Sequence, residues 1–420
     1  MKTRGFAKLI LFLLLAIGLA GCASDETKIN IQEMLSKPKT YVGSDECKFC
    51  HLEHYDSWKN TLHSRTIMDV TQNRDALIAE IDKEVIRADL KLMEKDLQVP
   101  IDDIYIPEAE EIRYTIGMQW KQGFLIEKDG TLYVASVQYN AKSEQWVNYH
   151  EKDWDQRPWN QYCVGCHATG VDLDKGTFSE SSVGCEACHG PGSHHVALPE
   201  TAVFDKRATI INPSHLPAGF RTQICGSCHG SGKSTKKQNV EWPVGYQPGR
   251  ALGVYFKSTR FGDGNIKEVY AENFGKGHHE QYQSWKLSTH ANEGVTCTSC
   301  HYVHQLGVPP TQFQTKGSGS QQCLMCHQVI NQNMAHSIHS FANCIGCHMP
   351  RIAKSEESGD NHSHAFVALL PKDTLENPKV PNSCQTCHKH KEDDLATLQN
   401  VYDGITKKTL LRVHQQRSRL

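Results

Sequence analysis

The chain has 420 residues, which is long enough for two or three ordinary domains. Its apolar fraction of 38% is low for a protein of this size with a core of side chains alone, so another component is expected in the interior. The formal net charge of −2 excludes the strongly basic surface that is typical of nucleic-acid-binding proteins.

The first 21 residues have the pattern of a leader for export. Three basic residues precede a short apolar run at residues 9–20, which is too short for a stable membrane-spanning helix. The run ends in Leu-Ala-Gly before Cys22, and this resembles a bacterial lipobox. We interpret residues 1–21 as a lipoprotein signal peptide and Cys22 as the lipidated first residue of the mature chain. The alternative is an ordinary signal peptide with a chance cysteine. No Asp follows Cys22, which by analogy with lipoprotein sorting favours the outer membrane.

Sixteen of the 17 cysteines fall in eight copies of the pentapeptide Cys-x-x-Cys-His, and Cys22 is the one left over. Two thiols three residues apart on a helical turn can form thioethers to the two vinyl groups of one haem, and the next histidine then lies under the iron as its proximal ligand. The cysteine pairs are Cys47 and Cys50, Cys163 and Cys166, Cys185 and Cys188, Cys225 and Cys228, Cys297 and Cys300, Cys323 and Cys326, Cys344 and Cys347, and Cys384 and Cys387. The proximal histidines are His51, His167, His189, His229, His301, His327, His348 and His388.

Other uses of paired cysteines fit this pattern less well. Zinc sites do not place a histidine directly after every second cysteine, and disulfides would not demand eight adjacent histidines. Thioredoxin-like motifs occur singly, on a βαβ unit. We therefore predict eight covalently bound haem c groups, whose propionates make the particle acidic and argue further against a nucleic-acid partner.

The segments of the chain differ in how densely they carry this motif. Residues 22–40 are polar and are expected to be a tether, and residues 41–69 form the first haem module. Seven motifs crowd into residues 163–391, which leaves little room for regular structure. We predict a mainly α protein with much irregular loop, a multihaem cytochrome c fold whose core is the haems themselves. Residues 392–420 place apolar residues on one helical face and predict a closing helix.

Residues 70–162 contain no haem motif and are interpreted as an insertion. Its first part, residues 71–97, has charged and apolar residues at helical spacing. Residues 111–149 instead alternate between apolar and polar, and Asp129-Gly130 separates two apolar runs, which is a strong hairpin signal. We predict a small antiparallel β meander there. A plain structural role for the insertion is favoured over partner docking.

Sixteen histidines remain after the proximal ones, which is twice the number needed for a second ligand on every iron. Two segments share the repeat Tyr-x-x-Trp-x-x-x-x-His and end at His63 and His290. His195 follows a tight Gly-Pro-Gly turn, and His336 and His339 lie three residues apart on a predicted helix. Methionine would raise the reduction potential but is scarce in this chain. The distal candidates are His63, His195, His290, His336, His339, His279, His304 and His364. Histidines such as His54, His278 and His390 are interpreted as surface or core residues.

Several stretches around the motifs resemble the cytochrome c-554 and related multihaem cytochromes. They are Tyr-Val-Gly-Ser at 41–44, the sequence around the motifs at 163–170 and 184–193, and Cys-Ile-Gly-Cys-His-Met-Pro at 344–350. The resemblance implies haems packed in parallel and perpendicular pairs. It also implies distal histidines drawn from distant sequence, matching His63, His195 and His290.

The predicted function is electron transfer along the haem chain, in anaerobic or extracellular respiration. The expected location is a bacterial outer membrane, on its periplasmic or surface face. Expected partners are other cytochromes, quinol-linked donors, a porin–cytochrome complex or a metal oxide. One alternative is reduction of a small nitrogen or sulfur oxyanion at an open haem, and another is a subunit of a cytochrome filament. Related octahaem enzymes mark the catalytic haem with an altered motif or a Lys ligand. All eight motifs here end in His, which favours an electron carrier, and no catalytic residue is assigned.

Overall fold

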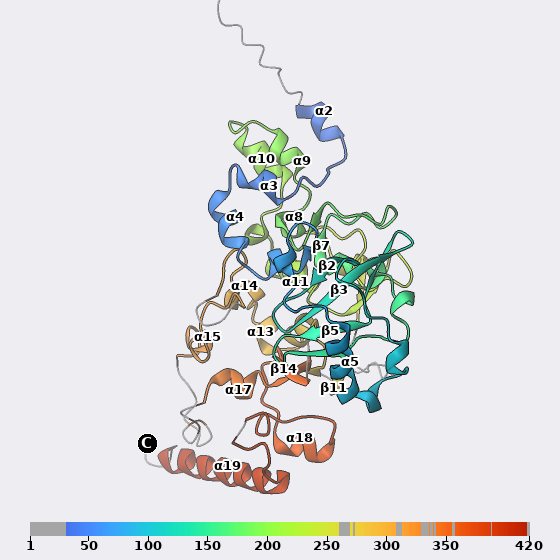
Figure 1. The fold of residues 1–420 in the computed structure, drawn as a ribbon. Helices are drawn as coiled ribbons and strands as arrows, with labels where there is room; N and C mark the ends of the chain where they lie inside the picture. Colours follow the sequence, from blue (N-terminus) through green and yellow to red (C-terminus); the bar gives the residue numbers. More distant parts are fainter. Residues whose placement is uncertain are drawn as a thin grey trace, which may run out of the picture.

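The computed structural model describes residues 31–259, 269–271, 274–307, 313–328, 336, 339, 342–354, 358–387 and 389–417. The predicted signal peptide and Cys22 therefore lie outside the described residues. The chain is elongated, with α3 (Ser44–Lys48) and α4 (Leu52–Trp58) toward one end and α18 (Pro371–Glu376) and α19 (Leu395–Arg417) at the other (Figure 1). Within the described part, no helix combines the length and the apolar character needed to cross a bilayer.

The predicted β meander is present as an antiparallel sheet of six strands in the order β1-β2-β3-β5-β6, with β4 also paired to β3. The sheet is larger than expected because β1, which precedes the insertion, adds to its edge through Ile67, opposite Ile116. The strands are β1 (Ile67–Asp69), β2 (Ile112–Ile116), β3 (Lys121–Lys128), β4 (Thr131–Val134), β5 (Val137–Asn140) and β6 (Gln145–Asn148).

The hairpin between β3 and β4 turns at the dipeptide that the sequence indicated. Lys128 pairs with Thr131, so the loop has only the two residues Asp129 and Gly130. Both have positive φ, 52° and 74°, which is the backbone of a type I′ turn and matches the twist of the flanking strands. The Asp-Gly signal was therefore correct in position and in turn type.

The helix expected within residues 71–97 is shorter than predicted. Only α5 (Lys83–Leu92) is α-helical, and single 3-10 turns lie at Arg74–Ala76 and Glu94–Asp96. The Asp82 side chain accepts hydrogen bonds from the first-turn amides and so caps the start of α5. The helix is amphipathic, and its face with Ile86 and Leu90 is fully buried against the sheet.

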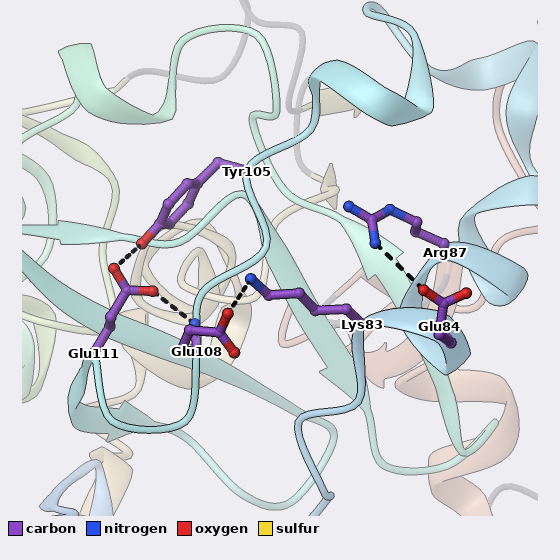
Figure 2. A network of polar contacts seen from close by, with 6 residues as sticks. All are labelled: Lys83, Glu84, Arg87, Tyr105, Glu108 and Glu111. Atoms are coloured by element: carbon purple, nitrogen blue, oxygen red, sulfur yellow. Dashed lines mark hydrogen bonds and ion pairs between the residues drawn. The ribbon is translucent and has the colours of Figure 1, made fainter.

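A polar network fixes α5 to the loop that leads into β2. Lys83 contacts Glu108 at 2.5 Å, and the backbone amide of Glu108 donates to the Glu111 carboxylate at 2.7 Å. The Tyr105 hydroxyl donates to the same carboxylate at 2.9 Å (Figure 2). These are mostly exposed contacts and contribute little energy each, so the buried apolar face remains the main support of the helix.

The motif-rich part of the chain consists of short helices and loops. Within its described residues, four two-stranded antiparallel ribbons join these helices, at β7–β8, β9–β10, β11–β12 and β13–β14. The helices are α6 (Trp159–Tyr162), α7 (Val164–His167), α8 (Cys185–His189), α9 (Ser193–Ala197), α10 (Val203–Thr209), α11 (Ala218–Gly226), α12 (Gln281–Lys286), α13 (Thr289–Asn292), α14 (Cys297–Cys300), α15 (Gln321–Leu324) and α17 (Cys344–His348). The ribbon strands are β7 (Ala168–Thr169), β8 (Glu180–Ser181), β9 (Gly232–Ser234), β10 (Phe256–Ser258), β11 (Val269–Ala271), β12 (Phe274–Gly275), β13 (Arg351–Lys354) and β14 (Ser358–His362).

Candidate functional site

A cavity of about 3520 Å³ runs through the motif-rich part of the chain. This is several times the roughly 300–1,000 Å³ of an ordinary small-molecule pocket. Cysteines from all eight Cys-x-x-Cys-His motifs line it, together with the proximal histidine of each motif from the first to the seventh. The polypeptide therefore leaves a large interior volume open. This agrees with the expectation, from the low apolar fraction of the sequence, that another component fills the interior.

Each of the first seven motifs occupies about one helical turn, which brings its histidine back over its first cysteine. The amide of His51 donates to the Cys47 carbonyl at 2.9 Å, and the amide of His229 donates to the Cys225 carbonyl at 2.8 Å. In the second motif, Gly165 faces the ring of Trp242 so closely that a Cβ would lie 2.2 Å from it. Only glycine fits there, since a side chain would displace the indole from beneath the motif.

Six proximal histidines have a second imidazole opposite them. Two imidazoles on one metal, each bonded at about 2.0 Å with a ring centre about 1.2 Å further out, would place their centroids about 6.4 Å apart. The observed separations agree with this geometry. The pairs are His51 and His195 at 6.3 Å, His63 and His229 at 6.1 Å, His189 and His304 at 6.1 Å, His290 and His327 at 5.9 Å, His301 and His364 at 6.3 Å, and His336 and His348 at 6.3 Å.

Backbone carbonyls orient several of these rings through Nδ1. The Nδ1 of His189 lies 2.7 Å from the Ile211 carbonyl, and that of His195 lies 2.9 Å from the Lys206 carbonyl. His364 Nδ1 contacts the carbonyl of His362 at 3.1 Å. A proton on Nδ1 leaves the Nε2 lone pair free to bind a metal, which is the tautomer that an iron ligand needs.

Burial keeps three of the paired imidazoles neutral. It lowers the pKa of His229 to about 3, and that of His304 and His364 to about 4, with neighbouring histidines lowering each further. Desolvation is the main cause in all three cases, because it disfavours the charged imidazolium. Neutral imidazole is the metal-binding form, so the electrostatics and the ring geometry agree.

His167, in the second motif, differs from the other described proximal histidines. Among the residues that the structure describes, no histidine ring faces it at the spacing of the six pairs, and its nearest aromatic neighbour is Trp159 at 5.7 Å. Burial lowers the pKa of His167 to about 4, and His279 and Lys121 act on it in the same direction. His279, a distal candidate, therefore lies near this motif, but the structure does not place it in a ring pair with His167.

The β insertion contributes to the surroundings of His167. The turn between β2 and β3 lines the cavity, and Lys121, the first residue of β3, places its ammonium 5.9 Å from the ring centre of Tyr149. His278 interacts electrostatically with both Lys121 and His167. Sequence reasoning missed Lys121 and His278, because neither carries a motif and the position of the insertion depends on tertiary packing.

The eighth motif is only partly covered, since His388 lies outside the described residues. The distal candidate His339 is described, and its ring centroid lies 6.3 Å from that of His390. The helix predicted to carry His336 and His339 falls largely outside the described residues as well. The partner of His339 across an iron therefore stays a prediction.

The internal Tyr-x-x-Trp repeat is also a structural repeat. Tyr55 and Trp58 lie 5.6 Å apart on α4, and Tyr282 and Trp285 lie 5.9 Å apart on α12. Each tryptophan Nε1 donates at 3.1 Å to a carbonyl close to another motif, that of Val183 or Val295. The Val183 carbonyl lies just before the third motif, and the Val295 carbonyl just before the fifth. The repeat thus fixes each helix to a neighbouring motif.

Electrostatic interactions between the motif thiols indicate which motifs lie near one another in space. Cysteines interact between the first and third motifs, the third and fourth, the fourth and fifth, the fifth and sixth, the sixth and seventh, and the seventh and eighth. The interacting pairs are Cys47 with Cys185, Cys188 with Cys228, Cys225 with Cys297, Cys300 with Cys323, Cys323 with Cys344, and Cys347 with Cys387. The second motif contacts the fourth, with Cys166 Sγ 3.9 Å from the Ser227 carbonyl. The motifs therefore form one row, with the second beside the fourth.

Repeated haem-attachment motifs that open onto one long cavity, with paired imidazoles across it, define the chain as a multihaem c-type cytochrome. Its residues 131–343, half of the chain, match the family model of cytochrome c552, and residues 46–95 match that of cytochrome c554 and c-prime. The chain belongs to the cytochrome c552 family, and the resemblance to the cytochrome c-554 group is confirmed.

Individual relatives are distant. Cytochrome c-552 of Aliarcobacter butzleri is 22% identical over 77% of this chain and 66% of its own length, and multiheme cytochrome MtrA of Shewanella baltica is 23% identical over 58% and 55%. The chain thus spans less than two thirds of the length of these relatives. The crystal structure of the outer cell wall cytochrome OcwA superposes with a TM-score of 0.70 at 23% identity, covering 90% of this chain and 89% of that one. The fold is shared with OcwA.

Proposed function

We propose that the chain binds eight haem c groups and conducts electrons along them. The observation that carries the proposal is the set of six imidazole pairs, with centroids 5.9–6.3 Å apart, around a cavity lined by every motif. The sixteen motif cysteines would form the thioethers, and the eight motif histidines would be the proximal ligands. Haem iron supplies a reversible one-electron couple, whose potential depends on axial ligands, burial and hydrogen bonding.

The proposed distal ligands follow from the ring pairs. With haems numbered by motif, His195 would serve haem 1, His304 haem 3, His63 haem 4, His364 haem 5, His290 haem 6 and His336 haem 7. His339 is the proposed ligand of haem 8. These residues hold each iron in place from both sides, so that little rearrangement is needed when an electron arrives or leaves.

The order of thiol contacts supports a route for the electrons. Haems 1, 3, 4, 5, 6, 7 and 8 would form the row, and haem 2 would branch from haem 4. Figure 1 places the first motif, between α3 and α4, at the opposite end of the molecule from α18 and α19, which flank the eighth. Redox partners would therefore dock at these two ends, and the chain would connect them over its full length.

Export and lipidation at Cys22 are part of the proposal. The lipid anchor would hold the chain at the outer membrane, where a porin–cytochrome complex, another cytochrome or a metal oxide would exchange electrons with it. A Cys22→Ala variant that fractionates with the membrane as the native chain does would contradict the anchor.

The test of the proposal is the haem content of the mature protein. We expect a mass equal to the polypeptide and its anchor plus eight haems, a c-type pyridine haemochrome spectrum, and complete reversible reduction in an electrochemical titration. A mature protein with fewer covalent haems would contradict the number. A protein without Soret absorbance would contradict the function.

A second candidate function is favoured by the environment of His167. An iron bound there would have no histidine opposite it at the spacing of the other pairs, and the ammonium of Lys121 would make the open side cationic. Such a site suits reduction of a small oxyanion, with haem 4 as the electron source. A high-spin ferric signal in electron paramagnetic resonance that nitrite or cyanide abolishes would support it. Low-spin signals from all eight haems would exclude it.

A further inference from the structure

Glu186 is a buried carboxylate inside the third haem motif. It lies between Cys185 and Cys188, and only 2% of its surface is exposed. Its two oxygens accept three backbone amides from two other segments. The donors are Val42 at 3.0 Å, Gly43 at 2.8 Å and Gly192 at 2.7 Å. Glu186 makes no ion pair with any of the residues that the structure describes.

A second, half-buried carboxylate lies on the same side of the first motif. Glu180 accepts the amide of Ser44 at 3.2 Å and its hydroxyl at 2.9 Å, and the Ser44 Oγ accepts the amide of Cys185 at 3.0 Å. Both Glu180 and Glu186 act electrostatically on the thiol of Cys47. Two acidic groups therefore lie where the first and third motifs meet, with no lysine or arginine paired to either within the described chain.

An ionised carboxylate in a protein interior is stable only when a cation or several hydrogen bonds compensate its charge. Three amides supply hydrogen bonds to Glu186 but no full positive charge. Apart from its propionates, a ferric haem with two neutral imidazoles carries one net positive charge, because the porphyrin dianion offsets two of the three charges of the iron. The ferrous form carries none. A carboxylate beside it therefore gains a charge pair in the ferric state only.

We propose that Glu186, supported by Glu180, lowers the reduction potentials of the haems held by the first and third motifs. The inference rests on the proposed binding of haem at these motifs. Reduction adds one electron to the iron and breaks no bond. Reduction removes the favourable charge pair between the carboxylate and the ferric core. The ferric form is therefore preferred, and the reduction potential is lowered. Glu186 is a positioning and tuning residue rather than an iron ligand.

The chain offers a matched control in Glu46. Glu46 directly precedes Cys47 as Glu186 directly follows Cys185, but its side chain is exposed to water, which screens its charge. The full-length, haem-loaded protein would be titrated in an optically transparent cell for the wild type, Glu186→Gln, Glu186→Asp and Glu46→Gln. Haem content, measured as pyridine haemochrome, would be recorded for every variant.

We expect Glu186→Gln to raise the midpoint potential of one or two components of the redox titration. The expected change is at least tenfold in the redox equilibrium constant, which is about 59 mV for a one-electron couple. Glu186→Asp keeps the charge, so its midpoint potentials should stay close to those of the wild type. The midpoint potentials of Glu46→Gln should also stay close to those of the wild type. If Glu186→Gln does not accumulate with a full set of haems, Glu180→Gln is measured instead and should move the same components upward.

Two results would overturn the proposal. One is a Glu186→Gln variant, or Glu180→Gln in its place, that carries all its haems and whose midpoint potentials shift no more than those of Glu46→Gln. The other is a Glu186→Asp shift as large as that of Glu186→Gln, which would indicate lost packing rather than lost charge. A wild-type protein without covalent haem would instead contradict the proposed function, so the two failures are distinguishable.

Discussion

The rings of His63 and His229 lie 6.1 Å apart with their planes crossing at 81°. The pair of His290 and His327 repeats this arrangement at 5.9 Å and 85°, and His63 and His290 both follow a Tyr–Trp helix. Two distant parts of the chain thus build the same near-perpendicular geometry. The rings of His189 and His304, in contrast, lie within 13° of parallel. Both copies of the repeat therefore precede a histidine that belongs to a near-perpendicular imidazole pair.

Removing one of these rings tests the ligand assignment. In His63→Ala, we expect one haem equivalent to change from low-spin to high-spin in electron paramagnetic resonance, because the iron of the fourth motif would keep only His229. The other haems should retain their spectra. His150→Ala is the control, since His150 is exposed on the insertion, where it contacts Asp153 at 3.5 Å. A fully low-spin His63→Ala would show that His63 is not an axial ligand.

The hairpin turn in the insertion allows a test that does not depend on haem. Gly130 has φ 74°, and a Cβ added there would meet no atom within 4 Å, so any cost of substitution comes from the backbone alone. Gly130→Ala should lower the free energy of unfolding by about 1–2 kcal/mol. Gly219→Ala is the control, because Gly219 lies in the first turn of α11 with equally open space and an ordinary helical backbone. Equal stability of Gly130→Ala and the wild type in urea titrations would contradict the assigned turn.

Glu151 should give the insertion an acid-sensitive component of stability. Burial would raise its pKa, but hydrogen bonds from the Gln98 amide at 2.7 Å and the Asn148 side chain at 2.8 Å outweigh it, and the pKa is lowered from its ordinary 4.5. A lowered pKa means that the unfolded chain binds the proton more readily. The contribution is therefore present above pH 4.5 and is lost as the pH falls through the lower value in the folded protein.

The measurement is the free energy of unfolding as a function of pH for the wild type and Glu151→Gln. The difference between them should be largest at neutral pH and should shrink between about pH 5 and pH 3, because protonated Glu and Gln are alike in charge. Glu127→Gln, on the exposed face of β3, serves as the control and should follow the wild-type curve. A constant difference across this range would mean that the hydrogen bonds, and not the charge, account for the contribution of Glu151.

Sequence reasoning succeeded where local chemistry decides the structure. The Asp129-Gly130 turn follows from backbone preference, and the one-turn geometry of each motif follows from its spacing. His304 and His364 were distal candidates that no nearby sequence pattern marks as ligands, yet the structure brings them opposite His189 and His301. Such pairs depend on packing between distant segments, which no local pattern encodes.

The insertion shows the same limit more clearly. Its strands were predictable from alternation and turn residues, but its role was not, because Lys121 reaches the second motif only through the docking of the whole sheet. Lys121 pairs with Asn140 at the edge of β5, and Tyr114 and Leu125 of the same sheet belong to an apolar cluster that includes Cys163 and Cys166. The sheet is therefore joined to the second motif by a shared core.

This position of Lys121 leads to a prediction about anion binding. If the haem of the second motif has an exchangeable side, replacing Lys121 with Met removes the nearby positive charge while keeping most of its length. Loss of a charged hydrogen-bond donor typically costs about 1.5–3 kcal/mol, so nitrite or cyanide should bind at least about tenfold more weakly to Lys121→Met. The shift of the Soret band on titration with either anion measures this affinity.

Lys128→Met is the matched control, because Lys128 lies at the other end of β3 and pairs with Asp155 at 3.0 Å in an exposed position. It should leave the anion affinity unchanged. If Lys121→Met binds the anions as tightly as the wild type, the ammonium does not face the open side of the iron. If the wild type binds neither anion and is low-spin throughout, the second haem has a sixth protein ligand, and His279 is then the residue to replace, since it acts electrostatically on His167.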